Sequence, residues 1–257
     1  MIKKLITYTL LILACITLII LGIRIFETTR VTSPKSSQSA FELAQKLSEK
    51  GSPLKVLILG DSIAKGTGDE QGKGFSGYLS EELKQSTSKD IIVKNEGIDG
   101  LTSTGLLEHL QSKRLNSEIT DADIILISIG GNDLLKSLPS NLLGQEDSFQ
   151  KQFASYLDNL KQSLKLLRTT NPNSAIILLG LYNPYEILIS AENQHLLNEL
   201  NDQSRQMIES DGNALYIPTY DLMKYNSTRY ISKDSLHPSS LGYQAISERI
   251  SQALKTH

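Results

Sequence analysis

Leu57-Ile58-Leu59-Gly60-Asp61-Ser62 is the stretch of sequence that decides the fold. Its first three residues continue an apolar run that begins at Val56, and the run stops at a glycine, which an acid and a hydroxyl follow. A short, continuously apolar run bounded by glycine is typical of a strand that is covered on both faces. The stretch therefore predicts a buried parallel strand that ends in a turn carrying Ser62.

Further runs of the same kind follow along the chain, and amphipathic stretches separate them. The predicted strands are 56–59, 91–93, 124–129, 175–179 and 214–217. The predicted helices are 41–50, 78–86, 103–115, 149–167, 193–210 and 241–254. Regular alternation of strand and helix indicates an open parallel sheet with helices on both faces. We therefore predict an α/β fold, namely a three-layer α/β/α sandwich around a five-stranded parallel sheet.

Composition limits the possible functions. The chain has 257 residues, a formal net charge of −2 and 39% hydrophobic residues, which suits one globular domain after a short N-terminal segment. Without a basic stripe, the sequence lacks the electrostatic attraction that nucleic-acid binding requires, so we expect no nucleic-acid partner. The single cysteine, Cys15, lies in the N-terminal segment. The folded part therefore has neither a disulfide nor a cysteine-based metal site.

The N-terminal segment predicts a membrane anchor. Lys3 and Lys4 precede an apolar run over residues 5–23, which is long enough to cross a bilayer core as a helix. Lysines before the run favour an extracytoplasmic domain after it, although Arg24 and Arg30 oppose this orientation. The predicted organisation is an anchor or signal at 1–27, a Ser/Thr-rich linker at 28–40 and a globular domain at 41–257.

Two other interpretations of the N-terminal segment stay open. A cleaved signal peptide would make the protein secreted, but such peptides normally have a shorter apolar core and a small-residue cleavage site. Ile12-Leu13-Ala14-Cys15 loosely resembles a lipidation site at Cys15. The apolar run nevertheless continues beyond Cys15, where a mature lipoprotein would become polar.

Candidate functional residues follow the predicted strands. Ser62 follows the first strand, Gly100 the second and Asn132 the third, and Asp234 and His237 lie in the loop before the last helix. Sheets of this kind bind ligands at the carboxyl ends of their strands. Ser62 is a candidate nucleophile with His237 as base and Asp234 as its orienting acid. The Ser62 and Gly100 N–H groups and the Asn132 amide are candidate donors to an oxyanion.

These residues lie in four blocks that resemble those of the GDSL or SGNH hydrolases. The blocks are Gly60-Asp61-Ser62-Ile63, Asn95-Glu96-Gly97-Ile98-Asp99-Gly100, Gly130-Gly131-Asn132-Asp133 and Asp234-Ser235-Leu236-His237-Pro238. Ile63 replaces the leucine that is usual in the first block. The resemblance implies a flavodoxin-like fold and hydrolysis of carboxylic esters or thioesters without a metal or an organic cofactor. Ala64 stands where the α/β-hydrolases have the second glycine of Gly-x-Ser-x-Gly.

Each of these residues also has a purely structural interpretation. Ser62 suits a helix N-cap, Asn132 an Asx turn and Gly100 a simple turn. We assign Asp61 and Asp133 structural roles. Residues 182–184, after the fourth strand, are a candidate pocket wall or a routine connection to the next helix.

The predicted activity is that of a serine ester hydrolase of lipase or acylhydrolase type, and the substrate is a small-molecule or lipid ester. Three alternatives remain open at this point. An O-acetylesterase or an acyltransferase acting on envelope polysaccharide would use the same residues. A binding module without catalysis would keep the sheet and use the cleft only for recognition.

Overall fold

The structure is a computed structural model that describes residues 35–142, 146–184 and 191–255. Gln38 and the residues after it form one compact unit. The predicted anchor at 1–27 lies outside the described residues. Within the described part of the chain, no helix is both long enough and apolar enough to span a bilayer.

Five parallel strands form one sheet in the order β2-β1-β3-β4-β5. The strands are β1 (Leu54–Gly60), β2 (Ile91–Gly97), β3 (Ile124–Ser128), β4 (Ala175–Leu179) and β5 (Ala214–Ile217). The strand order reverses between β1 and β3, and ligands of doubly wound sheets bind at such a point. The predicted α/β fold with a five-stranded parallel sheet is confirmed.

The apolar strands alternate their side chains between two cores. Val56 and Ile58 of β1 point into one core, and Leu57 and Leu59 point into the other. Every residue of β3 and β4 is buried, as a central strand covered on both faces requires. The edge strand β2 is less buried, and Ile92 is exposed. The continuous apolar pattern therefore reflects a sheet with helices on both sides.

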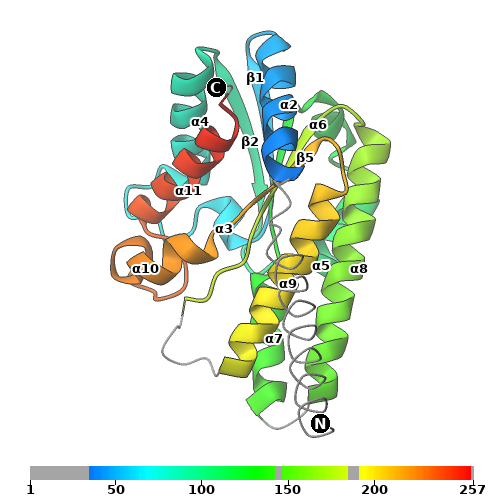
Figure 1. The fold of residues 1–257 in the computed structure, drawn as a ribbon, viewed down its shortest axis with the longest axis vertical. Helices are drawn as coiled ribbons and strands as arrows, with labels where there is room; N and C mark the ends of the chain where they lie inside the picture. The colour runs from blue at the N-terminus through cyan, green and yellow to red at the C-terminus, as the bar shows by residue number, and fades with distance from the viewer. Residues whose placement is uncertain (1–34, 143–145, 185–190, 256–257) are drawn as a thin grey trace, which may run out of the picture. The chain divides into compact units, whose positions relative to one another are not determined.

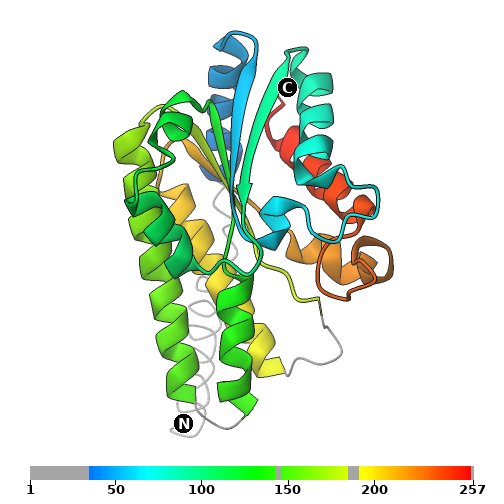
Figure 2. The ribbon, with the colours of Figure 1, turned by 180° about the vertical axis from the view of Figure 1, so that it is seen from behind.

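Helices cover both faces of this sheet (Figures 1 and 2). One face is covered by α2 (Lys35–Glu49), α4 (Gly74–Thr87), α10 (Tyr220–Tyr230) and α11 (Ser240–Ala253). The other is covered by α5 (Ser103–Gln111), α6 (Asn116–Asp121), α8 (Glu146–Thr170) and α9 (Ala191–Glu209). Two further helices, α3 (Ser62–Lys65) and α7 (Gly131–Leu142), begin just after β1 and β3. These two helices carry Ser62 and Asn132.

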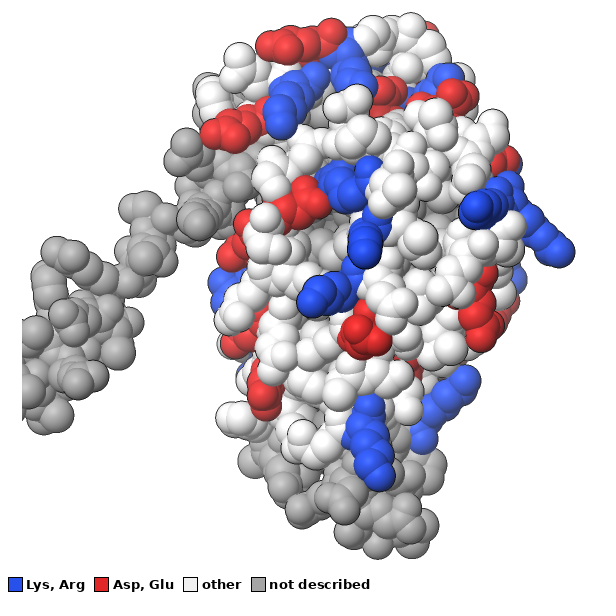
Figure 3. Space-filling view, turned by 90° about the vertical axis from the view of Figure 1, so that its right-hand side faces the viewer, with Lys and Arg blue, Asp and Glu red and all other residues white. Residues whose placement is uncertain are grey.

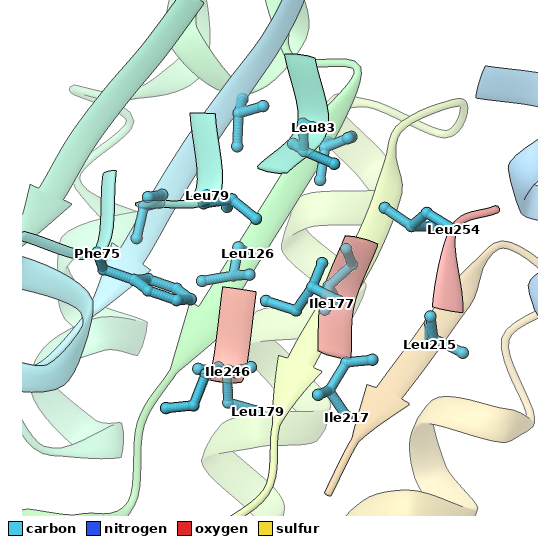
Figure 4. Close-up of a cluster of buried hydrophobic side chains, with 14 of the residues drawn as sticks. Phe75, Leu79, Leu83, Leu126, Ile177, Leu179, Leu215, Ile217, Ile246 and Leu254 are labelled. Atoms are coloured by element: carbon cyan, nitrogen blue, oxygen red, sulfur yellow. The ribbon is translucent and has the colours of Figure 1, made fainter. Parts of the chain in front are cut away.

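The core beneath α4 and α11 is built from large apolar side chains (Figure 4). Phe75 and Leu79 of α4 are fully buried, as is Ile246 of α11. They cover Leu126 of β3 and Ile177 of β4. Because α4 and α11 lie at opposite ends of the folded chain, this core ties the end of the domain to its beginning.

Several helix boundaries differ from the predictions. We predicted a linker over 28–40, but α2 begins at Lys35, inside it. Serines are tolerated in a first helical turn, and packing of Leu43 and Leu47 into the core extends a helix that composition alone does not favour. The predicted helix 103–115 ends as α5 at Gln111, and α6 follows as a separate short helix.

The pattern also missed two helices near the site, α7 and α10. The predicted elements include no helix over 131–142, but α7 begins at Gly131. The α10 segment has a weak amphipathic pattern, because only Met223 is fully buried and Asn226 interrupts it with non-helical dihedral angles. The α10 helix therefore depends on tertiary contacts more than on local periodicity.

Charged side chains are mixed on the face shown in Figure 3. Basic and acidic residues are interspersed there among uncharged ones. This mixture agrees with the near balance of 26 basic and 28 acidic residues in the whole chain.

Candidate active site

The turn after β1 depends on a glycine. Gly60 has a φ of +133°, and a Cβ added to it would lie 1.8 Å from the carbonyl oxygen of Ser128. The next residue, Asp61, donates its N–H to the same carbonyl over 2.9 Å. Gly60 thus lets β1 pass close to β3, and Ser62 begins α3 at the carboxyl end of the sheet.

Asp61 organises this turn from within the protein. Only 2% of its surface is exposed. Its Oδ1 accepts hydrogen bonds from the Ile63 N–H at 3.0 Å and the Ser128 hydroxyl at 3.2 Å, so it caps α3. Burial raises the pKa of Asp61 to about 7, although these hydrogen bonds act in the opposite direction. The turn that carries Ser62 therefore rests on a buried carboxyl group.

His237 lies between Ser62 and Asp234. Its Nε2 is 2.8 Å from Ser62 Oγ, and its Nδ1 is 2.7 Å from Asp234 Oδ2. Two hydrogen bonds thus join hydroxyl, imidazole and carboxylate in a continuous chain. This arrangement lets the imidazole take a proton from the hydroxyl while the carboxylate holds the ring.

Asp234 is held as an acceptor on both oxygens. Its Oδ1 accepts hydrogen bonds from the Ser232 hydroxyl at 2.6 Å, the Leu236 N–H at 2.9 Å and the His237 N–H at 3.0 Å. Partial burial raises the pKa of Asp234, but the hydrogen bonds from Ser232 and His237 outweigh it and hold this pKa well below its ordinary value. An ionised Asp234 favours a proton on Nδ1 of His237, which leaves Nε2 as the acceptor toward Ser62.

Other contacts hold the loop that carries His237. Ser232 donates its N–H to the His237 carbonyl at 2.8 Å, and the Tyr182 hydroxyl donates to the Leu236 carbonyl at 2.7 Å. Gly68, with a φ of +95°, lies so close that an added Cβ would be 2.6 Å from His237 Cβ. Sequence reasoning missed Ser232, although a serine two residues before an acid is a recognisable turn signal. No local signal links Tyr182 to this loop.

Asn132 lies in the first turn of α7, and Gly100 lies in the turn after β2. The Asn132 side-chain amide donates to the Leu101 carbonyl at 2.9 Å, which connects α7 to the Gly100 turn. Gly100 is exposed and has a φ of +76°. The structure places Asn132, but not Gly100, on the wall of the cavity that contains Ser62 and His237.

This cavity has a volume of about 110 Å³. Besides Ser62, His237 and Asn132, its wall is mostly apolar. The apolar residues in it are Ile63, Leu134, Leu135, Leu181, Tyr182, Pro184, Leu197 and Leu236. Residues 182–184 therefore form part of the cavity wall, as one of our two interpretations of this loop predicts. Across the described residues, no group of three or more His, Cys, Asp or Glu side chains is arranged to hold a metal ion.

Comparisons with known proteins were made for the whole chain. A family model described as "GDSL-like Lipase/Acylhydrolase family" matches residues 58–245. The chain is 30% identical to the uncharacterized protein YpmR of Bacillus subtilis, over 88% of this chain and 91% of that protein. It is 28% identical to the spore germination lipase LipC of Bacillus licheniformis, over 78% of this chain and 96% of the lipase.

Solved structures share the fold. The lipase Lip_vut3 from a goat rumen metagenome superposes with a TM-score of 0.72 at 27% identity, over 78% of this chain and 97% of the lipase. The acetylxylan esterase Axe2 of Geobacillus stearothermophilus has a TM-score of 0.59 at 21% identity, over 79% of this chain and 95% of the esterase. At that identity, the likeness to Axe2 shows the fold alone.

The buried Asp61 makes a prediction about stability and pH. Its pKa rises from 3.8 to about 7 on folding, so between these values the folded protein holds a proton that the unfolded chain has released. The free energy of unfolding should therefore fall as pH rises through this window, by up to ~4 kcal/mol. Asp61→Asn should reduce this fall, as measured by urea unfolding at pH 5 and pH 8. Burial also raises the pKa of Asp133, so part of the decrease in the free energy of unfolding should remain in Asp61→Asn.

A matched control is Asp202→Asn, because the Asp202 side chain is 60% exposed. In this variant, the free energy of unfolding should decrease between pH 5 and pH 8 by as much as in the wild type. If the free energy of unfolding decreases equally in Asp61→Asn and in the wild type, Asp61 is not the group that titrates.

Proposed function

Because the chain belongs to the GDSL-like lipase/acylhydrolase family, a family of carboxylic ester hydrolases, we propose that Ser62, His237 and Asp234 hydrolyse a carboxylic ester. The resemblance seen in the four sequence blocks is thereby confirmed at the level of the family. The observation that carries the proposal is the pair of hydrogen bonds, 2.8 and 2.7 Å, that joins Ser62 to His237 and His237 to Asp234.

In the first half of the proposed reaction, Ser62 Oγ attacks the carbonyl carbon of the ester and His237 Nε2 takes the hydroxyl proton. The carbonyl oxygen becomes an oxyanion, which accepts hydrogen bonds from the Ser62 and Gly100 N–H groups and the Asn132 amide. When the intermediate collapses, the carbon–oxygen bond to the alcohol breaks and His237 gives its proton to that alcohol. An acyl group then remains on Ser62.

The second half uses the same groups with water in place of the alcohol. His237 takes a proton from a water molecule as the water oxygen attacks the acyl carbon. Collapse of the second intermediate breaks the bond to Ser62 Oγ, which recovers a proton from His237. The products are a carboxylic acid and the enzyme in its starting state.

Labelling with a fluorophosphonate tests the nucleophile. The wild type should form a covalent adduct on Ser62, and Ser62→Ala should lose the adduct and reduce ester turnover by ~10⁴-fold or more. Ser210→Ala is the control, because Ser210 is exposed just after α9 and its hydroxyl donates to the Met207 carbonyl in the same turn. Intact-mass spectrometry and ester turnover are the measurements.

The possible outcomes separate the candidate functions. Folded wild-type protein that takes no label and turns over no ester would favour a binding module. Turnover that survives in Ser62→Ala would assign the chemistry to another residue. Ester products formed with an added acceptor alcohol would favour acyl transfer over hydrolysis.

The cavity wall supports a lipid-like substrate as part of this proposal. Leu134, Leu181 and Leu197 lie on the wall that also contains Ser62. A wall of this kind favours an apolar acyl chain, whose burial releases ordered water, over an acetyl group on a hydrated sugar. LipC, one of the similar proteins, is named as a lipase.

A panel of esters with two to twelve acyl carbons tests this substrate class. The wild type should prefer an acyl chain longer than acetyl. Leu197→Ala enlarges the cavity, so it should move the preference toward longer chains, as measured by kcat/KM across the panel. Leu200→Ala removes a buried leucine of the same helix that does not line the cavity. This control should lose stability but keep the wild-type preference, and a preference for acetate in the wild type would contradict the proposal.

We further propose that residues 5–23 anchor the protein in a membrane with its hydrolase domain outside the cytoplasm. The apolar run after Lys3 and Lys4 supports this location. The full chain should stay with washed membranes, and a chain that begins at residue 31 should not. Intact mass distinguishes the alternatives, since cleavage shortens the chain and lipidation at Cys15 disappears in Cys15→Ala. Full-length, unmodified protein in the supernatant would contradict the anchor.

A further inference from the structure

A second buried carboxylate lies next to the site, on Asp133 of α7. Only 2% of its surface is exposed. Its Oδ2 accepts the Ser103 N–H at 2.9 Å, and its Oδ1 accepts the Ser103 hydroxyl at 2.6 Å. Asn159 of α8 donates to the same hydroxyl oxygen at 3.0 Å. Asp133 thus joins the beginning of α7 to the beginning of α5 inside the protein.

One of these bonds gives a partner to the buried Ser103 N–H, which the start of α5 leaves without an intrahelical acceptor. Thr102 already occupies the N-cap position, and its hydroxyl oxygen accepts the Gly105 N–H. Burying a carboxylate costs free energy even when it is hydrogen-bonded. Capping accounts for the bond to the Ser103 N–H, and the second bond, from the Ser103 hydroxyl, further fixes the start of α5 to α7.

Asp133 and its neighbour Asn132 both form hydrogen bonds to the segment 101–103. The Asn132 amide donates to the Leu101 carbonyl at 2.9 Å, and Asp133 holds Ser103 two residues later. The Leu101 N–H in turn donates to the Ile98 carbonyl at 3.1 Å and closes the turn that contains Gly100. Two adjacent residues of α7 therefore hold the segment after Gly100 at Leu101 and at Ser103.

This arrangement matters for the chemistry because both segments carry proposed oxyanion donors. An amide nitrogen has two N–H groups, and Asn132 uses one of them on Leu101. The other is the one that we assign to the oxyanion, together with the Gly100 N–H. Donors of this kind act only when they are held in place before charge develops, and a displacement of ~1 Å can cost ~10²-fold in rate.

We propose that Asp133 is a positioning residue of the oxyanion site, which acts by clamping the Gly100 turn to the Asn132 segment through Ser103. The inference rests on the proposed function, because it presupposes that Ser62 forms an acyl-enzyme. Asp133 does not touch the reacting atoms. Its effect is transmitted through Ser103 and the turn before it.

Two variants weaken the clamp in different ways. Asp133→Asn keeps one oxygen acceptor and replaces the other with a donor, so it loses one of the two bonds to Ser103. Ser103→Ala loses the hydroxyl bond and keeps the N–H bond. Both should lower kcat by ~10- to 100-fold, with KM within ~3-fold of the wild type. Affinity for a trifluoromethyl ketone, which forms a tetrahedral adduct on the serine, should fall in parallel with kcat.

A double-mutant cycle separates positioning from general loss of stability. In the Asn132→Ala background, Asp133→Asn should lower kcat by a smaller factor than in the wild type, because Asn132→Ala already removes one oxyanion donor and the bond to Leu101 that helps to hold the Gly100 turn. Asn171→Ala is the matched control. Asn171 is buried and bonds to the Ile119 and Ala122 carbonyls at the amino end of β4, away from the site. It should lower stability and leave kcat and ketone affinity unchanged.

The results for Asp133 and Ser103 test the positioning role of Asp133 separately from the proposed ester hydrolysis. Wild-type kcat in folded Asp133→Asn and Ser103→Ala would overturn it, as would fully multiplicative effects of Asp133→Asn and Asn132→Ala. If Asp133→Asn does not fold, Ser103→Ala decides. Failure of the proposed function looks different, because Ser62→Ala would then retain turnover or the wild type would have none.

Discussion

The hydrogen bond of 2.8 Å between Ser62 Oγ and His237 Nε2 joins residues that lie 175 positions apart. The proposed chemistry depends on this contact, because a serine hydroxyl is a weak nucleophile until an adjacent base takes its proton. The contact exists because β1 lies inside the parallel sheet, between β2 and β3, and α11 packs beside α4. The last helix thereby returns the end of the domain to the carboxyl end of its first strand. Folding of the whole domain is thus a condition for the chemistry.

Three carboxylates around the site have different environments and different roles. Asp61 and Asp133 are each 2% exposed, and burial raises the pKa of both. Asp234 is more accessible, and its hydrogen bonds lower its pKa against the effect of partial burial. Asp234 faces the imidazole, Asp61 holds the backbone of the turn that carries Ser62, and Asp133 holds Ser103 at the start of α5. Local burial and hydrogen bonding therefore give three residues of one chemical type different environments, which suit the proposed orienting acid and two structural supports.

Family membership and the geometry of the cavity contribute different parts of the functional argument. The family model covers residues 58–245 and identifies a GDSL-like lipase or acylhydrolase. Similar folds serve lipases and an acetylxylan esterase alike, so the fold does not select a substrate. The apolar wall around Leu181 and Leu197 is a property of this chain, and it supports the proposed preference for an acyl chain longer than acetyl. The substrate class therefore rests on side chains of the cavity.

The sequence by itself determined the strands, their parallel arrangement and the four blocks that carry Ser62, Gly100, Asn132 and His237. These features are local, since an apolar run predicts a covered strand and a polar residue after it predicts a position at the sheet edge. Only the tertiary structure decided which distant residues support the site. Ser103 meets Asp133, and Tyr182 meets Leu236, through contacts between elements that packing brings together. No periodicity or spacing encodes such pairs, because they form only after the cores on both faces of the sheet have set the positions of the helices.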